Sequence, residues 1–227
     1  MLDTSKFYDF FQPEKCVGRI HIIGCGSVGS TIAELMARLG LTNFVLYDFD
    51  IVAPHNIANQ VFGAAAIGKQ KTEALRDILA YINPDLENVR IEAVGYTGQS
   101  LDGYVFLCVD NIELRHSIAS ACRMNPNIKA MFDVRTRLTD AQHYAARWDS
   151  MKEVKSFIAS MDFTQAEADA NTPVSACNTA LSVAPTVRMI CNCAVANFMN
   201  YIINGELKTF IPVDAFKFYL EAFPITS

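Results

Sequence analysis

The chain has 227 residues, 51% of them hydrophobic and 19% charged, which is enough apolar surface for a full core and excludes an intrinsically disordered protein. The net charge of −5 argues against nucleic acid as a partner, because a surface that binds the phosphate backbone needs clustered Lys and Arg. No apolar span of about 20 residues and no basic, cleavable leader is found, so we expect a cytoplasmic protein that does not enter a membrane.

The first predicted unit is a β-α-β crossover. A β-branched run at 19–23 leads directly into Gly-Cys-Gly-Ser-Val-Gly at 24–29. The predicted helix that follows has apolar residues at the i, i+3, i+4 and i+7 positions, and Gly40 stands where a left-handed cap is expected. A second apolar strand at 44–48 completes a unit of the size that such a crossover needs.

The next segment continues the alternation of strands and helices. After a long loop at 49–68, an amphipathic helix is predicted that stops at Asn83-Pro84. The runs at 89–94 and 104–110 have the composition of strands. Alternating elements of this kind predict a parallel sheet covered by helices.

The C-terminal half holds a predicted helix at 113–123 and two strand-like runs at 130–134 and 142–148. Residues 149–178 hold a charged helical piece and a polar, Ala-rich stretch. This is the most loop-like segment of the chain, and long loops in compact domains tend to be functional or mobile. A long helix is predicted from Pro185 to Gly205, and a hairpin closes the chain. We found no repeat and no linker, so we expect a single domain at 1–227 with a Rossmann-like α/β fold, a mostly parallel sheet with helices on both faces and a C-terminal antiparallel hairpin.

The seven cysteines indicate a reducing compartment, because they are an odd number without the spacing of a secreted disulfide framework. The closest pair, Cys191 and Cys193, would point in different directions on a helix. Structural zinc sites usually present Cys-x-x-Cys pairs, so we predict no zinc.

The glycines at 24, 26 and 29 form G-x-G-x-x-G between a predicted strand and a predicted helix. In this context Gly24 permits the tight turn, Gly26 lets the backbone approach a phosphate, and Gly29 allows close packing of helix and strand. An acidic residue about 20 residues later binds the ribose in NAD enzymes, and Asp48 fits that position. An NAD(H)-binding oxidoreductase is therefore one hypothesis, although no second catalytic domain is recognised.

The residues after Asp48 form a more specific pattern, D-x-D-x-V-x-x-x-N-x-x-x-Q, followed by Ile-Gly-Lys-Gln-Lys at 67–71. This series, continued by Val-Asp-Asn at 109–111 and by the terminal hairpin, resembles the E1-like adenylyltransferases, which include the MoeB/ThiF/HesA family and the ubiquitin-activating enzymes. The resemblance covers most of the chain. It implies a protein that binds ATP and Mg²⁺ and adenylates the C-terminal carboxylate of a ubiquitin-like or sulfur-carrier protein, or of a peptide.

The resemblance also implies roles for individual residues. The three glycines would line the phosphate loop, and Asp48 would hold the ribose. Lys71 would contact the phosphates, and Asp110 would bind Mg²⁺. The residues that would complete the nucleotide pocket are Asp50, Asn56 and Gln60. From the residues alone, Asp50 could equally be a solvated loop carboxylate and Lys71 an ordinary surface charge.

The chain departs from the family pattern at two cations. Asn59 stands where the family has an arginine that contacts phosphate, and the N-terminal arginine motif of the family is not recognisable in residues 2–11. Arg135 or Arg137 could substitute from another direction, or could instead pair with Asp133 or Asp140. The alternative function is therefore a nucleotide-binding E1-like scaffold with weak or lost catalysis.

Cys177 precedes the long helix, at a place where sulfur-transferring members of the family can carry a reactive cysteine. The resemblance thus allows transfer of the activated tail to Cys177, whereas an inert buried thiol is the alternative. The family is commonly homodimeric, and we expect a homodimer here. Within the enzyme class, a tRNA-modifying dehydratase relative fits poorly with the acidic charge balance.

Overall fold

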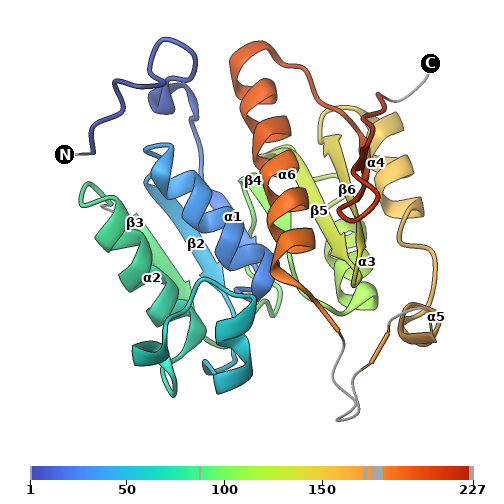
Figure 1. Cartoon of the computed structure of the whole chain (residues 1–227). Coiled ribbons are helices and arrows are strands. Elements are labelled where there is room, and N and C mark those ends of the chain that lie inside the picture. Colours follow the sequence, from blue (N-terminus) through green and yellow to red (C-terminus); the bar gives the residue numbers. More distant parts are fainter. Residues whose placement is uncertain (1, 87, 171–172, 175–180, 225–227) are drawn as a thin grey trace.

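The computed structural model describes residues 2–86, 88–170, 173–174 and 181–224. Its centre is an eight-stranded sheet with the order β3-β2-β1-β4-β5-β6-β7-β8 (Figure 1). The strands are β1 (Ile20–Ile23), β2 (Asn43–Tyr47), β3 (Asn88–Glu92), β4 (Gly103–Leu107), β5 (Ile128–Thr136), β6 (Asp140–Arg147), β7 (Phe210–Asp214) and β8 (Tyr219–Leu220). The first five strands in this order are parallel, and β6, β7 and β8 continue the sheet as antiparallel strands. The predicted Rossmann-like fold class and its C-terminal hairpin are confirmed.

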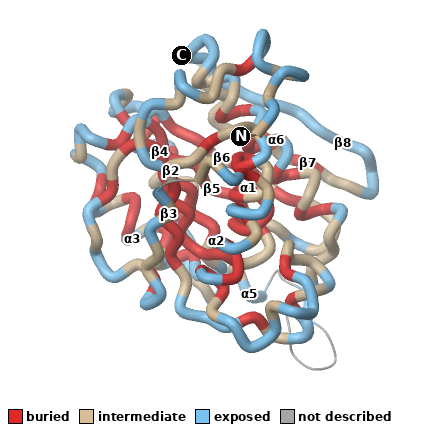
Figure 2. The backbone as a smooth tube through the Cα atoms, turned by 90° about the vertical axis from the view of Figure 1, so that its left-hand side faces the viewer, coloured by how far each residue is buried: buried red, intermediate tan, exposed pale blue. Residues whose placement is uncertain are grey.

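Helices cover both faces of the sheet. They are α1 (Ser27–Arg38), α2 (Lys71–Ile82), α3 (Ile112–Ala121), α4 (Met151–Ala159), α5 (Gln165–Ala170) and α6 (Ala184–Asn204), with short 3-10 turns at Pro13–Lys15, Pro54–Ala58 and Ala64–Ala66. Apolar side chains of α1, α2 and α6 share one hydrophobic cluster, whereas those of α3 and α4 belong to a second cluster on the other face. Figure 2 shows the buried backbone running through the middle of the molecule, with β8 at the exposed edge.

The ends of α1 and α6 lie where the sequence predicted them, whereas the helix predicted at 113–123 is α3 and ends at Ala121. Gly40 follows α1 with a φ of +83°, and Gly205 caps α6 with a φ of +76°, a conformation that side chains other than glycine rarely adopt. The long loop at 49–68 is closed on itself by backbone contacts. Ile51 forms a bridge with Gln70, and the Val52 N–H donates to the Lys69 carbonyl, so the two ends of this loop are held together.

The strand order creates a crevice at the carboxyl ends of β1 and β4. These neighbouring strands lead in opposite directions, because α1 returns the chain to β2 on one side and α3 returns it to β5 on the other. Ligands of open α/β sheets bind at this kind of topological switch point. The fold therefore places a candidate site where the glycine loop meets the residues after β4.

One buried histidine fastens the antiparallel part of the sheet to α6. His143 Nδ1 lies 3.1 Å from the Asp133 carbonyl oxygen, and Nε2 lies 3.1 Å from Nδ2 of Asn197. A carbonyl only accepts hydrogen bonds, so Nδ1 donates to it and Nε2 accepts from the Asn197 amide, which requires a neutral ring. Burial lowers the pKa of His143 to about 4.

Acidification is expected to destabilise the protein through His143. The ordinary pKa of 6.5 applies to the unfolded chain, so unfolding takes up a proton when the pH lies between 6.5 and about 4. The contribution of the neutral His143 to the unfolding free energy is complete above pH 6.5 and is lost as the pH falls to 4. At 1.36 kcal/mol per pKa unit, the difference between the two pKa values corresponds to a loss of about 3 kcal/mol. Urea unfolding between pH 7 and pH 4 should show a steeper loss of unfolding free energy in the wild type than in His143→Gln, and equal slopes would contradict this assignment.

None of the helices in the described part of the chain is long and apolar enough to cross a membrane.

Candidate functional site

The glycine loop connects β1 to α1 and lies against the end of β4. Gly24 has a φ of +97°, and a Cβ on it would lie 2.8 Å from the Val109 nitrogen. A Cβ on Gly29 would lie 1.9 Å from the Gly24 carbonyl oxygen, so a side chain at 29 is excluded by close packing of helix and loop. Gly26 differs, because a Cβ there would meet no atom of the described residues within 4 Å. Open space therefore lies above the start of α1.

The N-terminus of α1 is open to a ligand. Gly26 is its N-cap, and no side chain of the described residues caps it. Unpaired N–H groups at a helix start, together with the positive end of the helix dipole, attract anions. This arrangement and the space above Gly26 fit a phosphate group.

Asp48 braces the glycine loop from the end of β2. Its Oδ2 accepts from the Cys25 N–H at 2.7 Å, and its Oδ1 accepts from the Asp50 N–H at 2.8 Å. Burial raises the pKa of Asp48, while the hydrogen bonds and the nearby Lys71 ammonium oppose this effect. A carboxylate offers about four acceptor positions, so two remain for a ligand such as a ribose.

Lys71 is not an ordinary surface charge. It begins α2, only 9% of its side chain is exposed, and its Nζ lies 2.7 Å from Oδ2 of Asp50. Asp50 is itself half exposed, with 52% of its side chain accessible. The sequence placed these residues 21 positions apart, and the structure brings them together as an ion pair beside the glycine loop.

The two remaining predicted nucleotide-pocket residues, Asn56 and Gln60, belong to one turn, in which the Gln60 N–H donates to the Asn56 carbonyl at 2.9 Å. Asn56 is buried, and its Oδ1 accepts from the Ala53 N–H at 2.8 Å, which stabilises the turn at Pro54–Ala58. Gln60 lines a cavity of about 620 Å³ between α1, α2 and α6, and its Oε1 is buried with no hydrogen-bond partner among the described residues. The structure therefore separates Gln60 from the cavity that contains Asp110.

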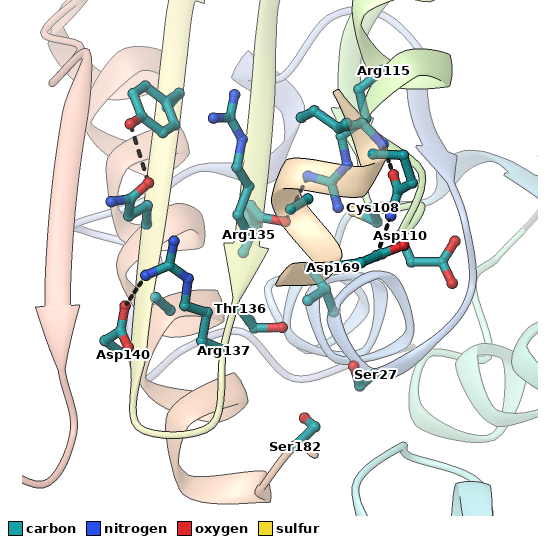
Figure 3. Close-up of a pocket in the computed structure, with 18 of the residues that line it drawn as sticks. Ser27, Cys108, Asp110, Arg115, Arg135, Thr136, Arg137, Asp140, Asp169 and Ser182 are labelled. Carbon is teal, nitrogen blue, oxygen red and sulfur yellow. Dashed lines mark hydrogen bonds and ion pairs between the residues drawn. The ribbon is translucent and has the colours of Figure 1, made fainter. Parts of the chain in front are cut away.

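The cavity at the switch point has a volume of about 720 Å³. Its lining includes Ser27 and Val28 from the start of α1, Asp110 after β4, and a wall from β5 and β6 (Figure 3). Asp110 is exposed and makes no hydrogen bond or ion pair with the described residues. Pockets of about 300–1,000 Å³ are typical of small-molecule sites. Among the predicted site residues, Asp110 lines this cavity directly, and the glycine loop reaches it through the start of α1.

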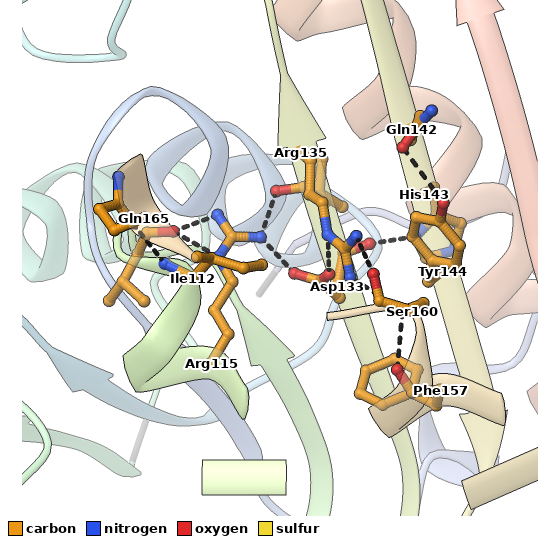
Figure 4. A network of polar contacts seen from close by, with 12 residues as sticks. Ile112, Arg115, Asp133, Arg135, Gln142, His143, Tyr144, Phe157, Ser160 and Gln165 are labelled. Atoms are coloured by element: carbon orange, nitrogen blue, oxygen red, sulfur yellow. Dashed lines mark hydrogen bonds and ion pairs between the residues drawn. The ribbon is translucent and has the colours of Figure 1, made fainter. Parts of the chain in front are cut away.

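A buried ion network forms the wall next to Asp110. Asp133 on β5 is fully buried, its Oδ1 accepts from Arg115, and its Oδ2 accepts from Nε of Arg135 at 2.6 Å (Figure 4). Arg115 also donates to the carbonyls of Val109 and Val134, and Arg135 donates to the carbonyl and hydroxyl oxygens of Ser160. The network holds the ends of β4 and β5 and the turn after α4 in one arrangement.

Several lining residues of the cavity had no signal in the sequence. Among them, Gln165, whose Oε1 accepts from the Ile112 N–H at 2.8 Å, was not singled out. Asp133, which is fully buried and pairs with the lining residues Arg115 and Arg135, was recognised only as a partner for an arginine. The contacts of both residues join segments that are distant in the sequence. Gln165 caps α3 from 53 residues away, and Asp133 pairs with Arg115, 18 residues before it. The predicted strand at 142–148 was the available signal for Gln142 and Tyr144, which line the cavity from β6.

The cysteines divide into those within the described structure and Cys177, which lies outside the described residues. Cys108 lines the cavity, and burial raises its pKa to about 12, so it is a protonated thiol at neutral pH. Cys191 is buried on α6, and burial raises its pKa well above the ordinary value. Within the described chain we find no group of three or more His, Cys, Asp or Glu side chains arranged to hold a metal ion.

Comparison with known protein families decides the affiliation. The sequence pattern of the ThiF family matches residues 15–227. The chain belongs to the ThiF family. The E1-like resemblance seen in the glycine loop and in the residues from Asp48 to Asp110 is thereby confirmed.

Curated relatives of this ThiF family member cover only part of it. The ubiquitin-like modifier-activating enzyme 5 of Drosophila virilis is 32% identical over 126 residues, which are 47% of this chain and 31% of that protein. The enzyme of the same name from Caenorhabditis elegans is 30% identical over 122 residues, 45% of this chain and 28% of that protein. The chain thus matches about a third of the length of these relatives.

Solved structures share the fold over nearly the whole chain. PaaA aligns with a TM-score of 0.72 at 16% identity, over 99% of this chain and 69% of PaaA. Escherichia coli MccB with ATP aligns with a TM-score of 0.69 at 15% identity, over 95% of this chain and 68% of MccB. At this identity the likeness concerns the fold of the ThiF family member alone.

Proposed function

We propose that this protein is an ATP-dependent adenylyltransferase that activates the C-terminal carboxylate of a ubiquitin-like or sulfur-carrier protein, or of a peptide. The observation that carries the proposal is the uncapped start of α1 at Gly26, which opens into the same cavity as Asp110. A phosphate site and a free carboxylate on one cavity are what a metal-assisted reaction at phosphorus needs. Membership of the ThiF family supports the same reaction class.

The names of the similar proteins support the class of substrate. Two relatives are named ubiquitin-like modifier-activating enzymes. One MccB structure contains MccA together with AMPCPP, an ATP analogue; it aligns with a TM-score of 0.72 at 16% identity, over 95% of this chain and 67% of MccB. We extend from these names only the general substrate, a protein or peptide with a free C-terminal tail.

The residues of the chain would share the work as follows. Gly24, Gly26 and Gly29 shape the loop that receives the phosphates, and Asp48 accepts the ribose hydroxyls with the two acceptor positions that its backbone contacts leave. Lys71, held by Asp50, supplies positive charge to the phosphates. Asn56 supports the turn that follows Asp50, and Gln60 would complete the pocket only if its side chain turned away from the second cavity.

The donor set at Asp110 fits Mg²⁺, which is commonly bound by one or two protein carboxylates together with substrate phosphates. Asp110 would hold the ion from the end of β4, and the ion would neutralise phosphate charge when bound. The carboxylate is exposed to the cavity and has no partner among the described side chains, so binding an ion there breaks no existing contact.

Further parts of the proposal are a single adenylation domain at 1–227, a homodimer, a cytoplasmic location and transfer of the activated tail to Cys177. The six cysteines of the described residues are free thiols, as is usual in a reducing compartment. The apolar face of α6 packs into the core, so it gives no independent support to a dimer.

A second candidate function is a nucleotide-binding scaffold with weak or lost catalysis. Two observations favour it: Asn59 stands in place of the family arginine, and the Lys71 ammonium is already paired with Asp50. An arginine at a reacting phosphate can be worth orders of magnitude in rate. The NAD(H) hypothesis has the glycine loop and Asp48 as its only support.

Two measurements test the proposal. Calorimetry with ATP and with NAD should show binding of ATP in preference to NAD. Exchange of radiolabelled pyrophosphate into ATP should depend on a protein or peptide with a free C-terminal carboxylate and should vanish when that carboxylate is amidated. ATP binding without pyrophosphate exchange in the presence of any carboxylate-bearing tail would favour the scaffold. Preferential binding of NAD would refute both the adenylyltransferase and the ATP-binding scaffold.

A further inference from the structure

The parallel strands arrange four groups in a row along one edge of the sheet. Asp48 follows β2, the glycine loop follows β1, Asp110 follows β4 and Arg137 follows β5, and these strands are neighbours in that order. Neighbouring strands lie about 4.8 Å apart, so Arg137 stands about two strand spacings, or roughly 10 Å, beyond the glycine loop. A nucleotide whose ribose lies at Asp48 and whose phosphates lie at the glycine loop would not reach Arg137. The end of the row at Arg137 would then be open to a second ligand.

The three arginines on this side of the cavity differ in how many hydrogen bonds and ion pairs their guanidinium groups make. Arg115 is buried and Arg135 is half-buried, with 7% and 16% of their side chains exposed, and both donate to Asp133 and to backbone carbonyls. Arg137 has 53% of its side chain exposed, and its guanidinium makes no hydrogen bond within the described residues. Its single ionic contact is Asp140, at 3.9 Å. Arg137 is therefore the cation of this wall that can bind an anion without breaking a buried network.

The surroundings of Arg137 suit an extended peptide end. It occupies the turn between β5 and β6, where its N–H donates to the Asp140 carbonyl at 2.8 Å. Gln142 and Tyr144 continue the wall along β6, and their side chains are joined by a hydrogen bond of 3.1 Å. Figure 3 shows Arg137 and Asp110 on opposite sides of the cavity, with Ser27 between them in this view. A carboxylate held by Arg137 would face phosphates bound at the start of α1.

We propose that Arg137 binds the C-terminal carboxylate of the incoming peptide or protein tail and directs it toward the nucleotide. The inference rests on the proposed adenylation. In that reaction one carboxylate oxygen forms a bond to the α-phosphorus, the bond from phosphorus to the β-phosphate oxygen breaks, and pyrophosphate leaves with that electron pair. No proton is transferred from the carboxylate, so the group needed at this end is a cation that orients the second oxygen. Arginine suits this task because its planar fork matches a carboxylate.

The test compares two synthetic probes, an eight-residue peptide that ends in Gly-Gly with a free carboxylate and the same peptide with a C-terminal amide. Binding of each is measured by calorimetry in the presence of an ATP analogue that cannot be cleaved at the α-phosphorus. In the wild type the acid should bind at least about tenfold tighter than the amide, the usual worth of a charged hydrogen bond. Arg137→Gln should remove this preference, Arg137→Lys should retain part of it, and both should bind the analogue with unchanged affinity.

Two further variants serve as matched comparisons. Arg123→Gln changes an exposed arginine in the turn after α3, close to the start of β5 and hence at the opposite end of the sheet, and should leave the preference for the acid intact. Asp140→Asn removes the carboxylate that competes for Arg137, so binding of the acid should be retained or tightened. Equal binding of acid and amide by the wild type, or a preference that survives in Arg137→Gln, would overturn the proposal. A preference that behaves as described, without pyrophosphate exchange, would instead count against adenylation and leave the assignment of Arg137 standing.

Discussion

Asp110→Ala is expected to lower the rate of pyrophosphate exchange by at least about a hundredfold, the usual effect of removing one electrostatic contact from a transition state. The reaction brings a carboxylate toward a polyphosphate, so the rate depends on positive charge between the two anions. Asp110 lines the cavity beside the start of α1 and has no partner among the described residues, which leaves it free to bind Mg²⁺.

Stability measurements separate this effect from a folding defect. An exposed side chain without contacts contributes little to stability, so the unfolding free energy of Asp110→Ala should stay within about 0.5 kcal/mol of the wild type. Glu113→Ala, an exposed carboxylate in the first turn of α3, is the matched control and should retain exchange. Exchange that survives in Asp110→Ala, with an unchanged requirement for magnesium, would refute the assigned metal site.

Asp133→Asn is expected to cause the largest loss of stability among these variants, about 3–5 kcal/mol, because it leaves a buried and a half-buried arginine without their counter-charge. Asp133 is fully buried and accepts from both Arg115 and Arg135, which are themselves largely removed from water. Taking the carboxylate charge away leaves two guanidinium groups without compensation in a low-dielectric environment.

Urea unfolding at pH 7 measures this loss. The comparison is Asp140→Asn, which removes the carboxylate from the exposed pair with Arg137 and should change the unfolding free energy by less than about 1 kcal/mol. A loss in Asp133→Asn as small as that of the exposed pair would mean that the buried network is not needed for folding.

The local parts of the fold could be predicted from the sequence because they depend on neighbouring residues. The spacing of apolar residues in α1, the turn into Gly24 and the left-handed Gly205 each follow from short-range geometry. The direction of β6 could not be predicted, because alternation of buried and exposed residues is the same in parallel and antiparallel strands.

Individual residues of the site could be predicted from the sequence, whereas the contacts between them could not. The glycine loop and Asp110 follow from motifs, and the structure places both at the switch point. The pairing of Lys71 with Asp50 and the position of Gln60 in a second cavity depend on how the loop at 49–68 folds back on itself. Such long-range contacts leave no periodic trace in the sequence. Arg135 and Arg137, at the end of β5 and just after it, were visible in the sequence, but their different roles could not be told apart without their partners.

The turn after α4 is held at two points that belong to different elements. Arg135 binds Ser160, and five residues later Gln165 caps the first turn of α3. Opening this stretch alone would uncover the Arg135 guanidinium, which pairs with the buried Asp133, so the amide hydrogens of the stretch should exchange with solvent together with those of β5 and not at the rate of a surface loop. The end of β5 and the turn after α4 thus form one cooperative unit. A variant that loosens either segment should show faster amide hydrogen exchange in both.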